Sequence, residues 1–187
     1  MEQLKTYDLI LDQVFPRDGR PHQATATFIL RFLPSFQPEE EIVITLGPES
    51  KASVVTFRAE DSIWRKLGEA SRNGGAASPL AIAASVKVER MQLAVAEAAA
   101  RKWADQLLGA AEAYAKDLRA APAGNAGNEN SIEVDGTLYR MVIETPQSDL
   151  TLEFSATGTP THQNALDDFM GAMERVRREV TALQKQR

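Results

Sequence analysis

The 187 residues contain no cysteine. Disulfide bonds, thiolate nucleophiles and cysteine-ligated metal sites are therefore excluded. Only two histidines occur, His22 and His162. They are too far apart in sequence to form the i, i+4 pair that zinc sites place on one helix face. We interpret both as exposed polar residues, and we predict neither a metal site nor a cofactor.

The short motifs that mark common enzymes are also missing. The sequence has no G-x-x-x-x-G-K-[ST] or G-x-G-x-x-G phosphate-binding loop, no G-x-S-x-G nucleophile elbow and no EF-hand loop. Three consecutive glutamates, Glu39 to Glu41, follow a proline. General-acid catalysis needs a carboxyl group whose pKa is raised by burial, and we expect this run to be solvated. No catalytic residue is predicted, which favours a protein that is not an enzyme.

Long apolar runs are absent as well. No segment approaches 18 strongly apolar residues, and the first residues lack the pattern of a signal peptide. We therefore expect no membrane association and a cytoplasmic location. The alternative is an exported mature form whose signal peptide has been removed.

Basic residues are fewer than acidic ones: the chain has 21 Lys and Arg and 26 Asp and Glu, which gives a net charge of −5. This balance argues against nucleic-acid binding, which needs a basic surface. A basic cluster does lie near the C-terminus, and its members are Arg175, Arg177, Arg178, Lys185 and Arg187. We interpret it as the soluble outer face of a last helix whose dipole favours cations. The alternative is a site for an anionic partner.

Aromatic residues make up only 6% of the chain. Large aromatic side chains dominate burial where small ones supply little apolar area. We therefore predict that Trp64 and Trp103 both lie in the core, each anchoring a helix.

The residues that are present predict strands first. Composition and partial alternation favour strands at residues 6–14, 23–33, 41–46 and 52–58. A short helix follows, capped by Asp61 or Ser62, and Ser78-Pro79 begins a second helical region. Residues 79–119 are Ala-rich and are predicted as one long helix. The alternation of S-V-K-V-E indicates an alternative, a break or short strand near residues 86–89.

The second half again predicts strands followed by a helix. Residues 121–130 are rich in Gly and Asn and predict a flexible loop. Asp135-Gly136 indicates a tight hairpin turn between strands at residues 132–134 and 137–144. A strand at residues 150–154 and a helix at 162–185 follow. The expected core face of this helix is Leu166, Phe169, Met170, Met173, Val176, Val180 and Leu183.

These elements predict an α+β fold, in which an antiparallel sheet of about six or seven strands packs against the Ala-rich helical region and the C-terminal helix. We expect a single domain over residues 1–187. The alternative is two hairpin-plus-helix units, residues 1–120 and 131–187, joined by the loop at 121–130. The second unit alone would have a thin core.

We interpret the segment L-R-F-L-P-S-F-Q-P as a stiff connection between two strands, and the alternative is a binding loop. Each proline makes the preceding residue extended, so Phe36 can fold back over the sheet. We name Arg31, Phe32, Leu33 and Phe36 as candidate binding residues. The predicted function is a non-enzymatic protein-binding or assembly module that uses the sheet face or the long helix, with a protein partner or a second copy of the chain. The alternative is an enzyme whose site is assembled from scattered acids, arginine and histidine.

Overall fold

A computed structural model describes residues 2–15, 24–35, 37–48, 52–72, 78–120, 136–145, 150–158 and 164–186. Its strands are β1 (Ala26–Pro34), β2 (Glu40–Leu46), β3 (Ala52–Ala59), β4 (Val88–Ala94), β5 (Thr137–Thr145) and β6 (Leu150–Gly158). Its helices are α1 (Glu2–Val14), α2 (Ile63–Arg72), α3 (Pro79–Ala84), α4 (Glu97–Ala120) and α5 (Ala165–Gln184). The predicted segments at 132–135 lie outside the described residues.

The six strands form one sheet in the order β4-β3-β2-β1-β5-β6, and every neighbouring pair is antiparallel. The α+β fold with an antiparallel sheet and a C-terminal helix is thereby confirmed. The hairpins β2–β3 and β5–β6 pair with opposite sides of β1. The segments before and after residues 121–130 therefore share one sheet.

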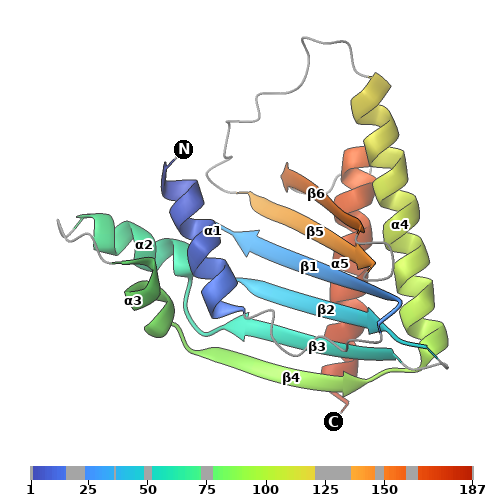
Figure 1. The fold of residues 1–187 in the computed structure, drawn as a ribbon, viewed down its shortest axis with the longest axis horizontal. Coiled ribbons are helices and arrows are strands. Elements are labelled where there is room, and N and C mark those ends of the chain that lie inside the picture. Colours follow the sequence, from blue (N-terminus) through green and yellow to red (C-terminus); the bar gives the residue numbers. More distant parts are fainter. Residues whose placement is uncertain are drawn as a thin grey trace.

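Helices cover both faces of this sheet. Helix α1 crosses in front of it, with α2 and α3 nearby, and α5 runs behind it beside α4 (Figure 1). The face that packs on α4 and α5, here called the α5 face, carries the larger core: Phe28, Leu30, Ile42, Ile44, Met141 and Ile143 come from the sheet. The opposite face, here called the α1 face, packs on Tyr7, Ile10, Leu11 and Val14 of α1.

The strand predicted at residues 6–14 is wrong, because this segment is the helix α1. Its buried residues, Tyr7, Ile10, Leu11 and Val14, follow the three- and four-residue spacing of one helix face. In a strand Leu9 would share a face with Tyr7 and Leu11, but Leu9 is 58% exposed whereas the other two are buried. The helical period thus overrides the partial alternation.

The single long helix over residues 79–119 is also wrong. Helix α3 ends at Ala84, and Ser78 caps its start by accepting a hydrogen bond from the amide of Ala81. The predicted break is confirmed, since the chain then enters the strand β4 before α4 begins at Glu97. Val88 to Ala94 pair with β3, and this pairing satisfies backbone groups that a helix would have satisfied internally.

Helix α5 confirms the predicted C-terminal helix and its core face. Phe169, Met170, Met173, Val176 and Val180 are buried, while Leu166 and Leu183 are partly buried against the same core. Asn164 begins the helix by accepting a hydrogen bond from the amide of Asp167. Acidic residues in the first turn favour the positive end of the helix dipole.

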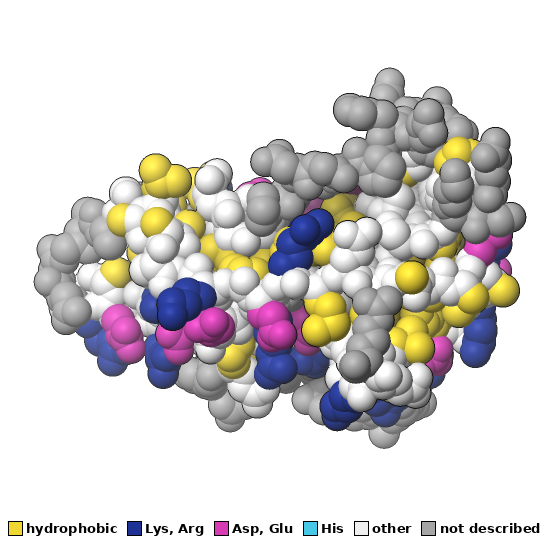
Figure 2. Space-filling view, turned by 90° about the horizontal axis from the view of Figure 1, so that it is seen from below, with side chains coloured by type: hydrophobic (Ala, Val, Ile, Leu, Met, Phe, Trp, Pro, Cys, Tyr) yellow, Lys and Arg dark blue, Asp and Glu magenta, His cyan; other side chains and the backbone are white. Residues whose placement is uncertain are grey.

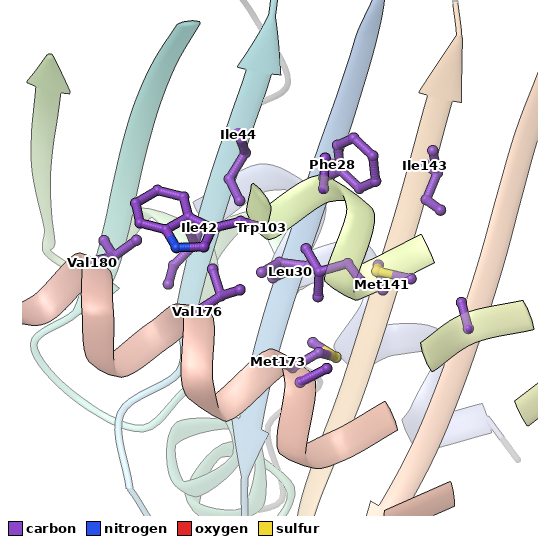
Figure 3. Close-up of a cluster of buried hydrophobic side chains, with 14 of the residues drawn as sticks. Phe28, Leu30, Ile42, Ile44, Trp103, Met141, Ile143, Met173, Val176 and Val180 are labelled. Carbon is purple, nitrogen blue, oxygen red and sulfur yellow. The ribbon is translucent and has the colours of Figure 1, made fainter. Parts of the chain in front are cut away.

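The two tryptophans differ in burial. Trp103 is 2% exposed, which confirms its predicted place in the core. It points from α4 toward Ile42 and Val180 (Figure 3), and its indole Nε1 donates to Glu179 Oε2 at 2.6 Å. Trp64 is only partly buried and packs edge-on against Tyr7, with ring centroids 5.1 Å apart.

Candidate functional site

The acidic run at residues 39–41 is buried, so the expectation that it is solvated is wrong. The exposed fractions are 0% for Glu39, 9% for Glu40 and 3% for Glu41. Because side chains alternate along a strand, Glu40 faces α5 whereas Glu39 and Glu41 face α1. Burial of three consecutive carboxylates requires a partner for each one, and the structure supplies all three.

Glu39 caps the start of α2. Its Oε2 accepts from the amide of Ile63 at 2.8 Å, and its Oε1 accepts from the amide of Trp64 at 3.0 Å and from the Tyr7 hydroxyl at 2.9 Å. Ser62 adds the predicted cap, since its hydroxyl accepts from the amide of Arg65. Burial raises the pKa of Glu39 above its ordinary value, and the hydrogen bonds offset only part of this effect. Burial, followed by the nearby Glu39 carboxylate, raises the pKa of Tyr7 as well.

Glu41 pairs with Arg31, which stands directly opposite on β1. Arg31 Nε donates to Glu41 Oε2 at 2.7 Å, and Arg31 Nη2 donates to Asp12 of α1 at 2.9 Å. Arg140 on β5 also has two acidic partners: its Nη1 lies 2.9 Å from Asp8 Oδ1, and its Nε lies 3.2 Å from Glu153 Oε1. Asp8 and Asp12 are four residues apart on α1, so one face of the helix meets both arginines.

Glu40 pairs with Arg177 of α5. Arg177 Nε donates to Glu40 Oε2 at 2.7 Å, and Nη1 donates to Glu174 Oε1 at 3.3 Å. The guanidinium lies 4.9 Å from the centroid of the Phe32 ring, which is a cation–π contact. Burial by itself lowers the pKa of Arg177. The carboxylates of Glu40 and Glu174 together have a larger, opposite effect, so the pKa lies above its ordinary value. This cluster fastens α5 to the sheet.

The structure places the predicted binding residues in different surroundings. Phe32 is buried on the α5 face and Leu33 is buried on the α1 face. Arg31 is 2% exposed and is engaged by Glu41 and Asp12. Phe36 lies outside the described residues. Arg31 and Leu33 therefore lie on the α1 face and Phe32 on the α5 face, so these three buried side chains do not form a common surface.

The described residues hold no group of three or more His, Asp or Glu side chains that could ligate a metal ion. His22 and His162 both lie outside the described residues. Within the part of the chain that the structure covers, no helix is long and apolar enough to cross a membrane. The buried acidic side chains at residues 39–41 are held by hydrogen bonds and ion pairs within the fold, on both faces of the sheet.

The two edges of the sheet differ in charge. The β4 edge carries Glu89 and Arg90, both exposed, directly after Lys87. Figure 2 views the molecule from this side and shows acidic and basic side chains interspersed along it. Charges on an edge strand oppose pairing with another chain. This edge is protected.

The β6 edge has little such protection. Within the described chain β6 has a neighbour, β5, on one side only. Its sequence L-T-L-E-F-S-A-T-G contains one charged residue, Glu153, and no proline. Thr151, Ser155 and Thr157 are exposed, and Leu152 is 39% exposed. A strand of nine residues with this composition presents backbone groups suited to further pairing.

Helix α4 continues past this edge. The Tyr114 hydroxyl donates to the Ser155 carbonyl of β6 at 3.1 Å, so the helix reaches the edge strand at this point. In Figure 1 the last turns of α4 extend beyond β6. Its buried stripe contains Ala104, Leu107 and Ala111, and the same spacing continues to Leu118. Leu118 is 57% exposed, because the sheet of its own chain ends before it.

Comparison with known proteins gives no match: no family model, curated protein or solved structure matches this chain.

Proposed function

We propose that the protein is an assembly module that pairs with a second copy of itself through β6 and the end of α4. The observation that carries this proposal is the β6 edge, which has no second strand neighbour in the described part of the chain, beside an apolar stripe of α4 that extends past it. The sequence-based hypothesis is a protein-binding or assembly module that uses the sheet face or the long helix, and the present proposal uses a sheet edge and the end of α4.

Self-pairing of β6 is chemically favourable. An antiparallel pair centred on Phe154 sets Thr151 opposite Thr157, Leu152 opposite Ala156 and Glu153 opposite Ser155. No like charges oppose each other in this register, and Glu153 keeps its ion pair with Arg140. Leu152 and Phe154 lie on the α5 face, since their partners Ile143 and Met141 belong to that core. The apolar row of that face therefore continues from one copy into the next.

The overhang of α4 supports the same partner. In such a pair a two-fold axis perpendicular to the sheet passes between the two β6 strands at Phe154. Both α4 helices then lie on the same face of a joined twelve-stranded sheet, at opposite ends of its strands. The last turn of one α4 would then lie over the sheet of the other copy. Leu118, exposed in the single chain, would lose contact with water in the pair.

The register makes a charge-reversal test possible. Thr151 and Thr157 are exposed and, within one chain, lie opposite Glu144 and Leu138. The double variant Thr151→Lys/Thr157→Lys sets like charges opposite each other twice across the two-fold axis. Thr151→Lys/Thr157→Glu sets opposite charges there and is otherwise matched. Sedimentation equilibrium over a range of concentrations measures the dissociation constant of each.

We expect the wild-type chain to form dimers, the Lys/Lys variant to associate at least about tenfold more weakly, and the Lys/Glu variant to associate no more weakly than wild type. Circular dichroism and thermal unfolding control for loss of fold. A wild-type chain that stays monomeric at its highest soluble concentration contradicts the proposal. Equal effects of the two double variants contradict the β6 register.

A further inference from the structure

A pocket of about 480 Å³ lies between the C-terminal half of α5 and the strands β2, β3 and β4. This volume is within the range of small-molecule sites, about 300–1,000 Å³. The pocket is on the α5 face near the β4 edge, so the width of the sheet separates it from β6. Its chemistry is independent of the proposed assembly.

The inner wall of the pocket is fixed by contacts between helix and sheet. Arg177 is held by Glu40 and Glu174, as described above. About two helical turns further on, Gln184 Nε2 donates to the Thr56 hydroxyl of β3 at 2.7 Å. These two links join α5 to β2 and β3 on both sides of the hollow. A site with linked walls binds a ligand at a smaller cost in conformational entropy.

Three further cations line the pocket: Arg58 from β3, and Arg178 and Lys185 from α5. None of the three has an ion-pair partner among the described residues, in contrast to Arg31, Arg140 and Arg177. Glu89 is the one lining carboxylate, within the same part of the chain, that also has no ion pair. With the cluster of Arg177, Glu40 and Glu174 included, the lining carries four positive and three negative charges, a sum of one positive charge in a chain whose net charge is −5.

The helix dipole accounts for only one of these cations. Lys185 is the C-cap of α5, where positive charge is favoured. Arg178 precedes the last turn, and α5 has no basic residue within that turn. Arg58 is on a strand. Cations that converge from two separate elements on one hollow have the arrangement of an anion site.

We propose that this pocket binds a small organic dianion, of the class of a phosphate monoester. Arg58 and Arg178 approach the charged group from opposite walls, and Lys185 neutralises it further. The side chains of Met91 and Ala182 supply apolar lining for the organic part. This assignment follows the anionic-partner interpretation of the C-terminal basic cluster, restricted to the members that line the pocket.

Titration calorimetry on the full chain tests the assignment with three probes. Phenyl phosphate has the dianion and an apolar ring, inorganic phosphate has only the charge, and benzoate has the ring with a single charge. We expect saturable binding of phenyl phosphate in physiological salt, and binding at least about tenfold weaker for each of the other two. Arg58→Gln/Arg178→Gln should weaken phenyl phosphate binding at least about tenfold, whereas Arg175→Gln should leave it unchanged.

Arg175 is the matched control because it is an exposed arginine of the same helix that does not line the pocket. The proposal is overturned if phenyl phosphate shows no saturable binding to the folded wild-type chain. It is also overturned if the Arg58/Arg178 variant and the Arg175 variant bind equally, because the anion would then be held by general charge. Tighter binding of a single-stranded oligonucleotide than of phenyl phosphate would also overturn the proposal, because the ligand of the pocket would then be a polyanion.

Discussion

Arg31 and Arg140 stand directly opposite each other on β1 and β5. Two like charges in this position repel each other and destabilise a sheet. Here four carboxylates surround the pair: Glu41 and Asp12 contact Arg31, and Asp8 and Glu153 contact Arg140. Since Asp8 and Asp12 belong to α1, the position of this helix on the sheet is set by charge as well as by its apolar face.

Glu41→Gln should destabilise the fold strongly. Arg31 is 2% exposed and would lose its closest carboxylate while still facing Arg140. Breaking a buried ion pair by removing one partner costs about 3–5 kcal/mol, and urea denaturation measures this loss. Glu153→Gln is the matched control, because Glu153 is 58% exposed and should contribute no more than about 1 kcal/mol. Equal losses in the two variants would contradict this account.

Glu39 should make stability depend on pH. Because its pKa in the folded chain is raised above the ordinary value of 4.5, the folded state holds its proton more tightly than the unfolded state. The stability contributed by this proton is complete below pH 4.5 and is lost as the pH rises through the folded pKa.

The variant Glu39→Gln has no proton to lose at this position. Its free energy of unfolding, relative to wild type, should therefore increase as the pH rises from 4.5 and become constant above the folded pKa. Chemical denaturation at a series of pH values measures the difference. A difference that falls over this range would show that the three hydrogen bonds to Glu39 outweigh its burial.

Trp103→Ala should cost about 3–5 kcal/mol of stability, since it removes a buried aromatic side chain and leaves a cavity between α4, α5 and the sheet. Trp64→Ala should cost less, because Trp64 is only partly buried and its main aromatic contact is Tyr7. Thermal and urea unfolding compare the two variants. Acrylamide should also quench the fluorescence of Trp64 more than that of Trp103, measured in the single-tryptophan variants Trp103→Phe and Trp64→Phe.

Leu118→Glu should weaken self-association without lowering the stability of the folded chain, because this side chain is 57% exposed beyond the β6 edge. Leu80→Glu is the control: Leu80 is 66% exposed, but it belongs to α3 on the α1 face. Sedimentation velocity should show a loss of dimer for the first variant only. An equal response of the two would remove α4 from the proposed interface.

Much of the fold could be predicted locally. The strands β1, β2, β3, β5 and β6 and the helix α5 have apolar patterns of the correct period and length. The strand prediction for residues 6–14 was wrong because the apolar residues there fit part of the helical period and part of the strand period. The prediction of one helix over residues 79–119 was wrong because alanine favours a helix throughout this segment, whereas β4 is stabilised by its pairing with β3.

The burial of Glu39, Glu40 and Glu41 could not be predicted from the run itself. Each partner is distant in sequence: Tyr7 and the start of α2 for Glu39, Arg177 for Glu40 and Arg31 for Glu41. The β6 edge and the pocket at α5 also depend on contacts between residues that are distant in sequence. Strand order decides which strand has only one neighbour, and helix packing decides which cations converge.

The class of fold, the exclusion of cysteine chemistry and the apolar faces of most elements follow from composition and periodicity, because these are local properties of the chain. The packing of distant segments sets which charges are buried and, among the described residues, which edge strand carries few charges and which basic residues have no ion pair. These depend on residues brought together from far apart, where burial and pairing set the free energy of each charge. The same acidic stretch that looks solvated in sequence thereby becomes the anchor of three separate helices.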